Sequence, residues 1–243
     1  MPRIFEDFEP RFADKGPRAF PRNLFFDDWA RRDSGWYRNI VHLSLQSLVL
    51  VRRIRYDPFM RVIAGTAKGR TLVGPKTHSI RPALDKIKGA IFNILFDVSD
   101  LAVLDVFAGT GSIGIEALSR GAKRAVFLDA SAEALAIVKK NLELCRFEDR
   151  ATVLRTKLPE DLRAVAKRSG IDGFDLIFVD PPYDKDLVNA SLRKVAELGL
   201  LAAEGKIIVE HSPREAILEI PGLAVTDRRE YGQTVISFLS NAI

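Results

Sequence analysis

Short apolar segments alternate with longer amphipathic ones through most of this 243-residue chain, and this alternation limits the fold more than any other feature. Five strands are expected, at residues 101–106, 125–128, 151–154, 174–179 and 206–210. The intervals between them are long enough for helices, which parallel strands need as crossover connections. Two further strands, at 223–228 and 234–239, have no helix between them. The sequence therefore predicts an α/β fold with a doubly wound, mostly parallel seven-stranded sheet and an antiparallel edge.

A smaller extension is expected in front of this sheet. Residues 61–73 have the pattern of a hairpin, with Gly65 and Gly69 at its turns. Pro82 then opens a helix. Its apolar residues form one stripe, namely Leu84, Ile87, Ile91, Ile94, Leu95 and Val98.

The first 59 residues are patterned differently, because they show no sustained period of 2 or 3.6 residues. We therefore divide the chain into a poorly patterned extension (1–59), a basic hairpin and helix (60–99) and the sheet domain (100–243). One interpretation is that Met60 is the true start and that 1–59 is not translated. The other is that 1–59 is a genuine, weakly ordered extension.

Composition excludes several classes of protein. The chain is 47% hydrophobic and 28% charged, so it can bury a core and is neither disordered nor collagen-like. Its one cysteine, Cys145, excludes an internal disulfide, and His42, His78 and His211 lack the spacing of metal ligands. No segment has the length of a membrane span, and the first ten residues lack the apolar core of a secretory signal. We expect a cytoplasmic protein without a metal.

Positive charge is concentrated in one part of the chain. The net charge is only +5, but seven basic residues and a single acid, Asp85, lie within residues 61–88. The basic residues are Arg61, Lys68, Arg70, Lys76, Arg81, Lys86 and Lys88. Such a segment either contacts nucleic-acid phosphates or is an ordinary solvated surface.

A glycine-rich loop follows the first strand. Gly109, Gly111 and Gly114 have the spacing G-x-G-x-x-G between a strand and a helix, which lets a ligand approach the backbone closely. The alternative is that these glycines only permit a tight turn and close packing.

Nearby acids indicate the ligand. Asp105 ends the strand, and Glu116 lies one turn into the following helix. Two carboxylates oppose a pyrophosphate but favour an ammonium and a sulfonium, so S-adenosylmethionine is preferred over a nicotinamide dinucleotide. Asp129, after the second strand, is placed for a ribose diol.

The fourth strand ends in Asp180-Pro181-Pro182-Tyr183. Ligands of doubly wound sheets bind beyond the carboxyl ends of the strands, so this turn is expected opposite the glycine loop. Prolines donate no amide hydrogen, and a carboxylate beside free carbonyls can accept both hydrogens of an exocyclic amine. Asp180 could then stabilise charge on that nitrogen and accept its proton, while Tyr183 stacks on an unstacked base. The alternative is a proline-rich turn with an ordinary surface tyrosine.

Together these segments resemble the RsmD family of bacterial 16S rRNA guanine-N2 methyltransferases, over residues 60–239. The matching segments are 61–65, 68–70, 81–82, 90–95, 105–112, 180–183 and 231–234. The basic hairpin joined to the Arg-Pro helix is specific to that family. The glycine loop and the Asp-Pro-Pro-Tyr turn occur in many amino-methyltransferases.

The resemblance implies a class I methyltransferase fold, S-adenosylmethionine as cofactor and one guanine of small-subunit rRNA as substrate, within an assembled or assembling 30S particle. A monomer without a membrane partner is expected. Asp180, Pro181, Pro182 and Tyr183 would form the target-base site. The candidate cofactor-binding residues are Asp105, Phe107, Gly109, Gly111, Ser112, Glu116, Asp129 and Thr156. Thr156 replaces the Asp or Asn that many methyltransferases place near the adenine amine. The candidate RNA-binding residues are Arg61, Lys68, Arg70 and Arg81.

Other functions stay open at this point. The same turn serves adenine N6 and the side-chain amide of protein glutamine, although no separate target-recognition domain is evident. A non-catalytic RNA-binding assembly factor would keep the fold without needing Asp180. A nicotinamide oxidoreductase would leave the Asp-Pro-Pro-Tyr turn unexplained.

Overall fold

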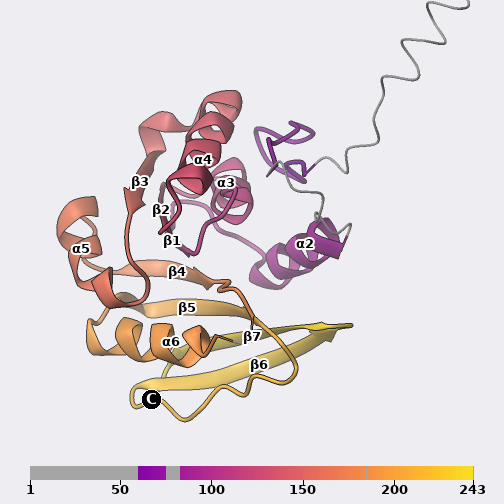
Figure 1. Cartoon of the computed structure of the whole chain (residues 1–243). Helices are drawn as coiled ribbons and strands as arrows, with labels where there is room; N and C mark the ends of the chain where they lie inside the picture. The colour runs from indigo at the N-terminus through magenta and orange to yellow at the C-terminus, as the bar shows by residue number, and fades with distance from the viewer. Residues whose placement is uncertain (1–59, 75–82, 184, 243) are drawn as a thin grey trace, which may run out of the picture. The chain divides into compact units, whose positions relative to one another are not determined.

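The computed structural model describes residues 60–74, 83–183 and 185–242, all within one compact unit (Figure 1). The proposed extension 1–59, together with Lys76, Arg81 and Pro82, lies outside these described residues.

A seven-stranded sheet organises the described part of the chain, in the order β3-β2-β1-β4-β5-β7-β6. Strands β1 to β5 are parallel, whereas β7 runs antiparallel to both β5 and β6. The strands are β1 (Ala102–Val106), β2 (Arg124–Asp129), β3 (Ala151–Arg155), β4 (Phe174–Val179), β5 (Leu201–His211), β6 (Leu223–Tyr231) and β7 (Thr234–Asn241). The predicted mostly parallel sheet with an antiparallel edge is confirmed.

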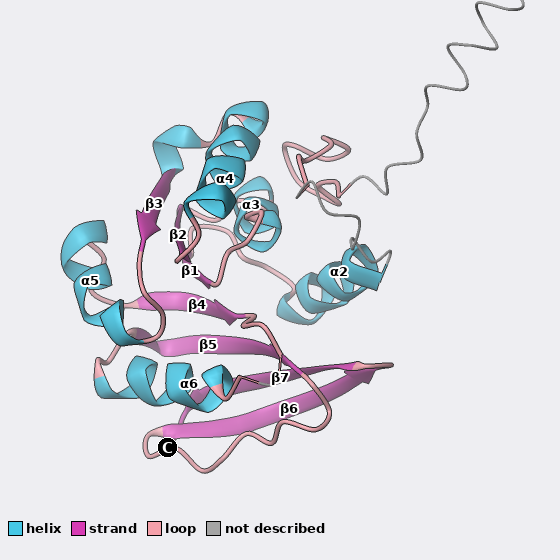
Figure 2. Cartoon of the chain, in the orientation of Figure 1, coloured by secondary structure: helices cyan, strands magenta, loops and turns pink. Residues whose placement is uncertain are grey.

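Helices cover both faces of this sheet (Figure 2). They are α2 (Ala83–Leu95), α3 (Ser112–Ser119), α4 (Ala132–Cys145), α5 (Arg163–Ser169) and α6 (Leu187–Glu197), with 3-10 turns η1 (Glu148–Arg150) and η2 (Glu160–Leu162). Helices α2, α3 and α4 pack into one hydrophobic cluster, and α5 and α6 pack into a second one. The β1 side chains alternate between the two, with Val103 in the first and Leu104 in the second.

Helix boundaries follow local chemistry. Ser131 caps α4, because its hydroxyl accepts the Ala134 amide at 3.2 Å. The segment after Pro159 begins as the 3-10 turn η2 and becomes α-helical only at Arg163. Asp161 interrupts it with non-helical backbone angles.

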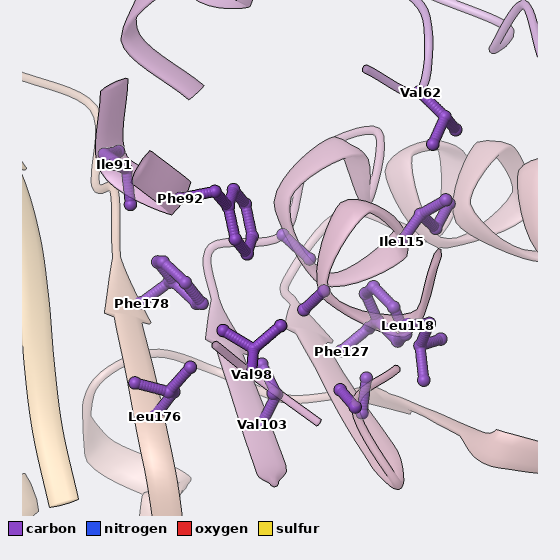
Figure 3. Close-up of a cluster of buried hydrophobic side chains, with 14 of the residues drawn as sticks. Val62, Ile91, Phe92, Val98, Val103, Ile115, Leu118, Phe127, Leu176 and Phe178 are labelled. Atoms are coloured by element: carbon purple, nitrogen blue, oxygen red, sulfur yellow. The ribbon is translucent and has the colours of Figure 1, made fainter. Parts of the chain in front are cut away.

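The segment before α2 turns as expected, and its two arms are joined by backbone hydrogen bonds, including Leu72 N–H to the Met60 carbonyl at 2.7 Å. A single antiparallel bridge joins Arg61 to Thr71. Gly65 has φ +82°, and a Cβ there would lie 1.8 Å from the carbonyl oxygen of Ser119, so only glycine permits this close approach to α3. Figure 3 shows Val62 beside Ile115, which joins this segment to the first hydrophobic cluster.

Helix α2 packs on the end of β4 through aromatic rings. The Phe92 and Phe178 ring centroids are 5.9 Å apart, and the two side chains face each other in Figure 3. The guanidinium group of Arg120 lies over the Phe92 ring, with its Cζ 4.8 Å from the ring centroid. The predicted apolar stripe is wrong at Ile94, which is 38% exposed, and at Val98, which is buried but lies beyond the end of α2. The side chain of Leu84 lies outside the described atoms.

Candidate active site

A pocket of about 240 Å³ opens at the carboxyl ends of β1, β4 and β5. The strand order reverses direction between β1 and β4, which is where doubly wound sheets bind ligands. Residues from α2 close one side of the pocket, and five of the candidate site residues line it, namely Asp105, Phe107, Gly109, Ser112 and Asp180. The residues from α2 are Ile87, Lys88 and Ile91.

The glycine loop forms one wall of this pocket. Phe107, Gly109 and Ser112 line it. Three residues of the loop have left-handed backbone angles, with φ +67° at Phe107, +54° at Gly109 and +76° at Gly111. Gly111 caps α3 behind the loop, where a Cβ would meet Val138 at 3.2 Å.

Asp105 lies at the base of the pocket and is 3% exposed. Its Oδ2 accepts the Gly114 amide at 3.1 Å. Burial raises the pKa of Asp105 to about 7; the Gly114 hydrogen bond opposes this shift, and the Asp129 carboxylate adds to it. A cation placed beside this carboxyl group would favour its charged form.

Asp129 fixes the loop from the neighbouring strand. Its Oδ2 accepts the Gly109 amide at 3.0 Å, and its Oδ1 accepts the Ser131 amide at 2.8 Å. Thr156 is buried, and its amide donates to the Asp129 carbonyl at 3.0 Å. Thr156 lines a different hollow, with Arg163 and other residues near α5, so the structure does not bring it to the pocket.

Asp180 enters the same pocket from the end of β4. The Asp180 side chain is exposed to solvent within the pocket, although protein atoms surround it closely. Desolvation by these atoms raises the pKa of Asp180 well above its usual range, and the Glu210 and Asp105 carboxylates raise it further. Pro181 is buried and Pro182 is exposed.

Tyr183 lies where its hydroxyl joins two strands. The hydroxyl donates to Glu210 Oε1 at 3.0 Å and lies 3.0 Å from Thr234 Oγ1. Its side chain is partly buried and does not line the pocket, so the structure places Tyr183 behind Glu210.

Glu116 is not in the pocket, and its predicted place among the cofactor residues needs correction. It is fully buried, and its two oxygens accept the amides of Ile63 and Ala64 at 2.7 and 3.0 Å. Arg120 Nε donates to Oε1 at 2.7 Å. The carboxylate faces the N-terminal segment because that segment supplies its hydrogen-bond donors.

Lys88 belongs to the basic residues of 61–88 that are candidates for phosphate contact, but the structure buries it. It is 2% exposed, and its ammonium group donates to the Arg61 carbonyl at 2.8 Å and to Ser112 Oγ at 2.9 Å. Burial lowers the pKa of Lys88, while Glu116 and Asp85 oppose that shift. Lys88 therefore links α2 to the glycine loop.

Three other basic residues do share an exposed groove. Arg61, Lys68 and Lys86 line a hollow of about 410 Å³ between the N-terminal segment and α2, together with Asp85. Arg61 lies 3.8 Å from Asp85. Arg70 is also exposed, but it is held elsewhere, since its Nη1 donates to the Leu144 carbonyl at 2.6 Å. Arg81 lies outside the described residues.

Sequence reasoning missed Glu210, which lines the pocket beside Asp180. A signal was present, because parallel strands β4 and β5 end at the same edge, with Val179 paired to Val209.

Within the ranges that the structure describes, no three His, Cys, Asp or Glu side chains are arranged as metal ligands. None of the helices described here is both long and apolar enough to cross a bilayer.

A glycine loop and an Asp-Pro-Pro-Tyr turn that meet across a sheet of this order define a class I S-adenosylmethionine-dependent methyltransferase. The family described as "Conserved hypothetical protein 95" matches residues 60–240. The chain belongs to this family, the RsmD family of rRNA methyltransferases.

Curated relatives and a solved structure agree with this assignment. YlbH of Bacillus subtilis, provisionally named an rRNA methyltransferase, is 40% identical over 180 residues, which is 73% of this chain and 97% of that protein. The ribosomal RNA small subunit methyltransferase D of Escherichia coli is 31% identical over 163 residues, 67% of this chain and 79% of that protein. The structure of Escherichia coli yhhF, provisionally named a methyltransferase, has a TM-score of 0.64 at 25% identity, covering 74% of this chain and 97% of that one.

Proposed function

We propose that this enzyme transfers a methyl group from S-adenosylmethionine to the exocyclic N2 amine of one guanine in 16S rRNA. The observation that carries the proposal is the single pocket shared by the glycine loop and Asp180. It would hold a cofactor against Asp105 and a base against Asp180, at the ends of neighbouring strands β1 and β4. The family membership and the relatives' names support rRNA as the substrate.

The cofactor half of the pocket fits S-adenosylmethionine. Asp105 is a buried carboxyl whose charged form lacks a cationic partner among its described contacts, and an ammonium group would supply one. The loop at Gly109 lets a ligand approach the backbone, and Asp129 lies directly behind it. When bound, S-adenosylmethionine supplies an activated methyl group on a sulfonium centre.

The base half of the pocket suits an amine with weak nucleophilicity. Asp180 would accept a hydrogen bond from the exocyclic amine and orient the nitrogen lone pair toward the methyl group. It would then stabilise the positive charge that develops on nitrogen and take one proton. A raised pKa suits this role, because the carboxylate is then a stronger base. Pro181 and Pro182 donate no amide hydrogens that would compete for this site.

The groove of Arg61, Lys68 and Lys86 supports an RNA partner, since exposed cations bind phosphates and release counterions. We propose a 30S particle or an assembly intermediate as the substrate, which places the enzyme in the cytoplasm. We further propose that the enzyme acts as a monomer.

The test is transfer of radiolabelled methyl from S-adenosylmethionine to 30S particles that lack this modification, followed by nucleoside analysis. Label in N2-methylguanosine supports the proposal, whereas label in N6-methyladenosine would overturn the choice of base. Asp180→Ala should lower turnover by roughly 10²–10⁴-fold and leave cofactor affinity nearly unchanged. Turnover near the wild-type rate would contradict the role of Asp180.

A further inference from the structure

The pocket contains a second carboxylate on the base side. Glu210 of β5 lines it together with Asp180 of β4. The two strands are parallel neighbours, with Val179 paired to Val209, so the two acids occupy the next position on each strand. They are close enough for Glu210 to raise the pKa of Asp180.

Glu210 is held in place from behind. The Tyr183 hydroxyl donates to its Oε1 at 3.0 Å and lies 3.0 Å from Thr234 Oγ1 on β7. Burial raises the pKa of Tyr183, so the hydroxyl keeps its proton and stays a donor. A carboxylate has about four acceptor sites, so Glu210 can accept hydrogen bonds from a ligand while it is held by Tyr183.

Two adjacent carboxylates match an edge that carries two adjacent donors. Guanine has such an edge, because the ring N1–H lies next to the exocyclic N2 amine. Adenine presents an unprotonated N1 beside its N6 amine, and a carboxylate facing that nitrogen would meet another acceptor. Hydrogen bonds from both donors would also relieve the repulsion between two acids in one pocket.

We propose that Glu210 accepts the N1–H hydrogen bond of the target guanine, so that it selects guanine over bases that lack this donor. Asp180 accepts the N2 amine, Glu210 accepts N1–H, and Tyr183 positions Glu210. This assignment rests on the proposed function, because it requires guanine N2 as the methylated atom.

The test compares two versions of 16S rRNA that differ only at the nucleotide methylated by the wild-type enzyme. One carries guanine and the other carries 2-aminopurine, introduced by ligation of a synthetic oligonucleotide before reconstitution of the particle. 2-Aminopurine keeps the N2 amine, but its N1 has no hydrogen. It also lacks O6, so the measured quantity is the ratio of methylation rates on the two rRNAs, compared between enzyme variants.

We expect the wild-type enzyme to prefer guanine by about tenfold or more. With 2-aminopurine, the Glu210 carboxylate would face an N1 that has no hydrogen to donate. Glu210→Gln offers N1 either a donor or an acceptor, so the preference should fall by about tenfold. Tyr183→Phe keeps the carboxylate but removes its anchor, so a smaller fall is expected. An unchanged preference in Glu210→Gln would overturn the assignment.

Each failure can be recognised separately. If the wild-type enzyme puts no label on guanine N2, the proposed function has failed and Glu210 is not the cause. If Glu210→Gln folds but transfers no methyl, competition between the two rRNAs for the variant loaded with S-adenosylhomocysteine gives the same preference as a binding ratio. A binding ratio equal to that of the wild type would again overturn the assignment.

Discussion

Glu116 of α3 accepts the main-chain amide of Ile63 at 2.7 Å, across 53 residues of sequence. Its other oxygen accepts the Ala64 amide at 3.0 Å, and the carboxylate is fully buried. Arg120 Nε lies 2.7 Å from the carboxylate and Lys88 Nζ lies 3.8 Å from it, so a positive charge approaches each oxygen. This acid therefore holds the N-terminal segment on α3 and, through Lys88, next to the pocket.

Glu116→Gln should destabilise the protein strongly. The side-chain amide can accept only one of the two backbone N–H groups, and the buried cations lose their counter-charge. We expect a loss of roughly 3–5 kcal/mol in the free energy of unfolding, measured in urea. Glu197→Gln is the matched control, because Glu197 is an exposed partner of Lys194 and should give no measurable change. A stable Glu116→Gln protein that fails to bind S-adenosylmethionine would instead place Glu116 in the cofactor site.

Gly114→Ala should also destabilise the protein, for a steric reason. A Cβ there would lie 2.3 Å from the Phe127 ring and 3.2 Å from Asp105 Oδ2. We expect a cost of about 1–3 kcal/mol in urea unfolding. Gly89→Ala is the control, since Gly89 lies within α2 and a Cβ would meet only Ile63 Cδ1, at 3.8 Å. That control should be neutral or gain about 0.5–1 kcal/mol, and equal losses in both variants would contradict the packing role of Gly114.

Stability should depend on pH through Asp105. Its folded pKa is raised to about 7 from an ordinary value of 3.8, so the folded state holds the proton more tightly than the unfolded state. The resulting stabilisation is complete below the unfolded pKa and is lost as the pH rises through about 7. From about pH 5 to about pH 7, the wild type should therefore lose up to ~1.4 kcal/mol per pH unit relative to Asp105→Asn. Parallel stability curves for the two proteins would contradict this.

Cofactor affinity should change with pH in the opposite direction. The Asp105 carboxyl must be ionised to pair with the ammonium group, which itself stays protonated below about pH 7. Titration calorimetry should show the dissociation constant of S-adenosylmethionine falling by up to ~10-fold per pH unit from about pH 5.5 to about pH 7. Asp105→Asn should bind more weakly and without this dependence. If the slope persists in that variant, another group carries it.

The sheet and the meeting of Asp105 with Asp180 could be predicted from sequence, because parallel strands end at one edge and the strand pattern was clear. The direction in which the Glu116 side chain points could not be predicted from sequence. One turn into α3, it could face either the loop or the N-terminal segment, and the docking of Ile63 and Ala64 decides between them. That docking depends on packing between segments far apart in sequence, which periodicity does not report.

The burial of Lys88 could have been predicted from its spacing along the helix, although its charge suggested an exposed position. It lies three residues before Ile91 and four before Phe92, so helical spacing places it on the buried face of α2. Counting it with the exposed cations of 61–88 overlooked that spacing. Its burial became possible because Glu116, Asp85 and two oxygen acceptors surround the ammonium group, and all of these except Asp85 come from other parts of the fold.

The groove beside α2 predicts how RNA binding should depend on salt. Replacing Arg61, Lys68 and Lys86 by alanine should weaken binding of 30S particles and reduce the slope of log affinity against log salt by about 2. The control removes the same charge from another hollow, with Arg163, Lys167 and Arg168 replaced by alanine. If the control lowers the slope and the groove variant does not, the rRNA backbone contacts the surface around α5. A loss of affinity at unchanged slope in the groove variant would mean that these side chains do not contact phosphates.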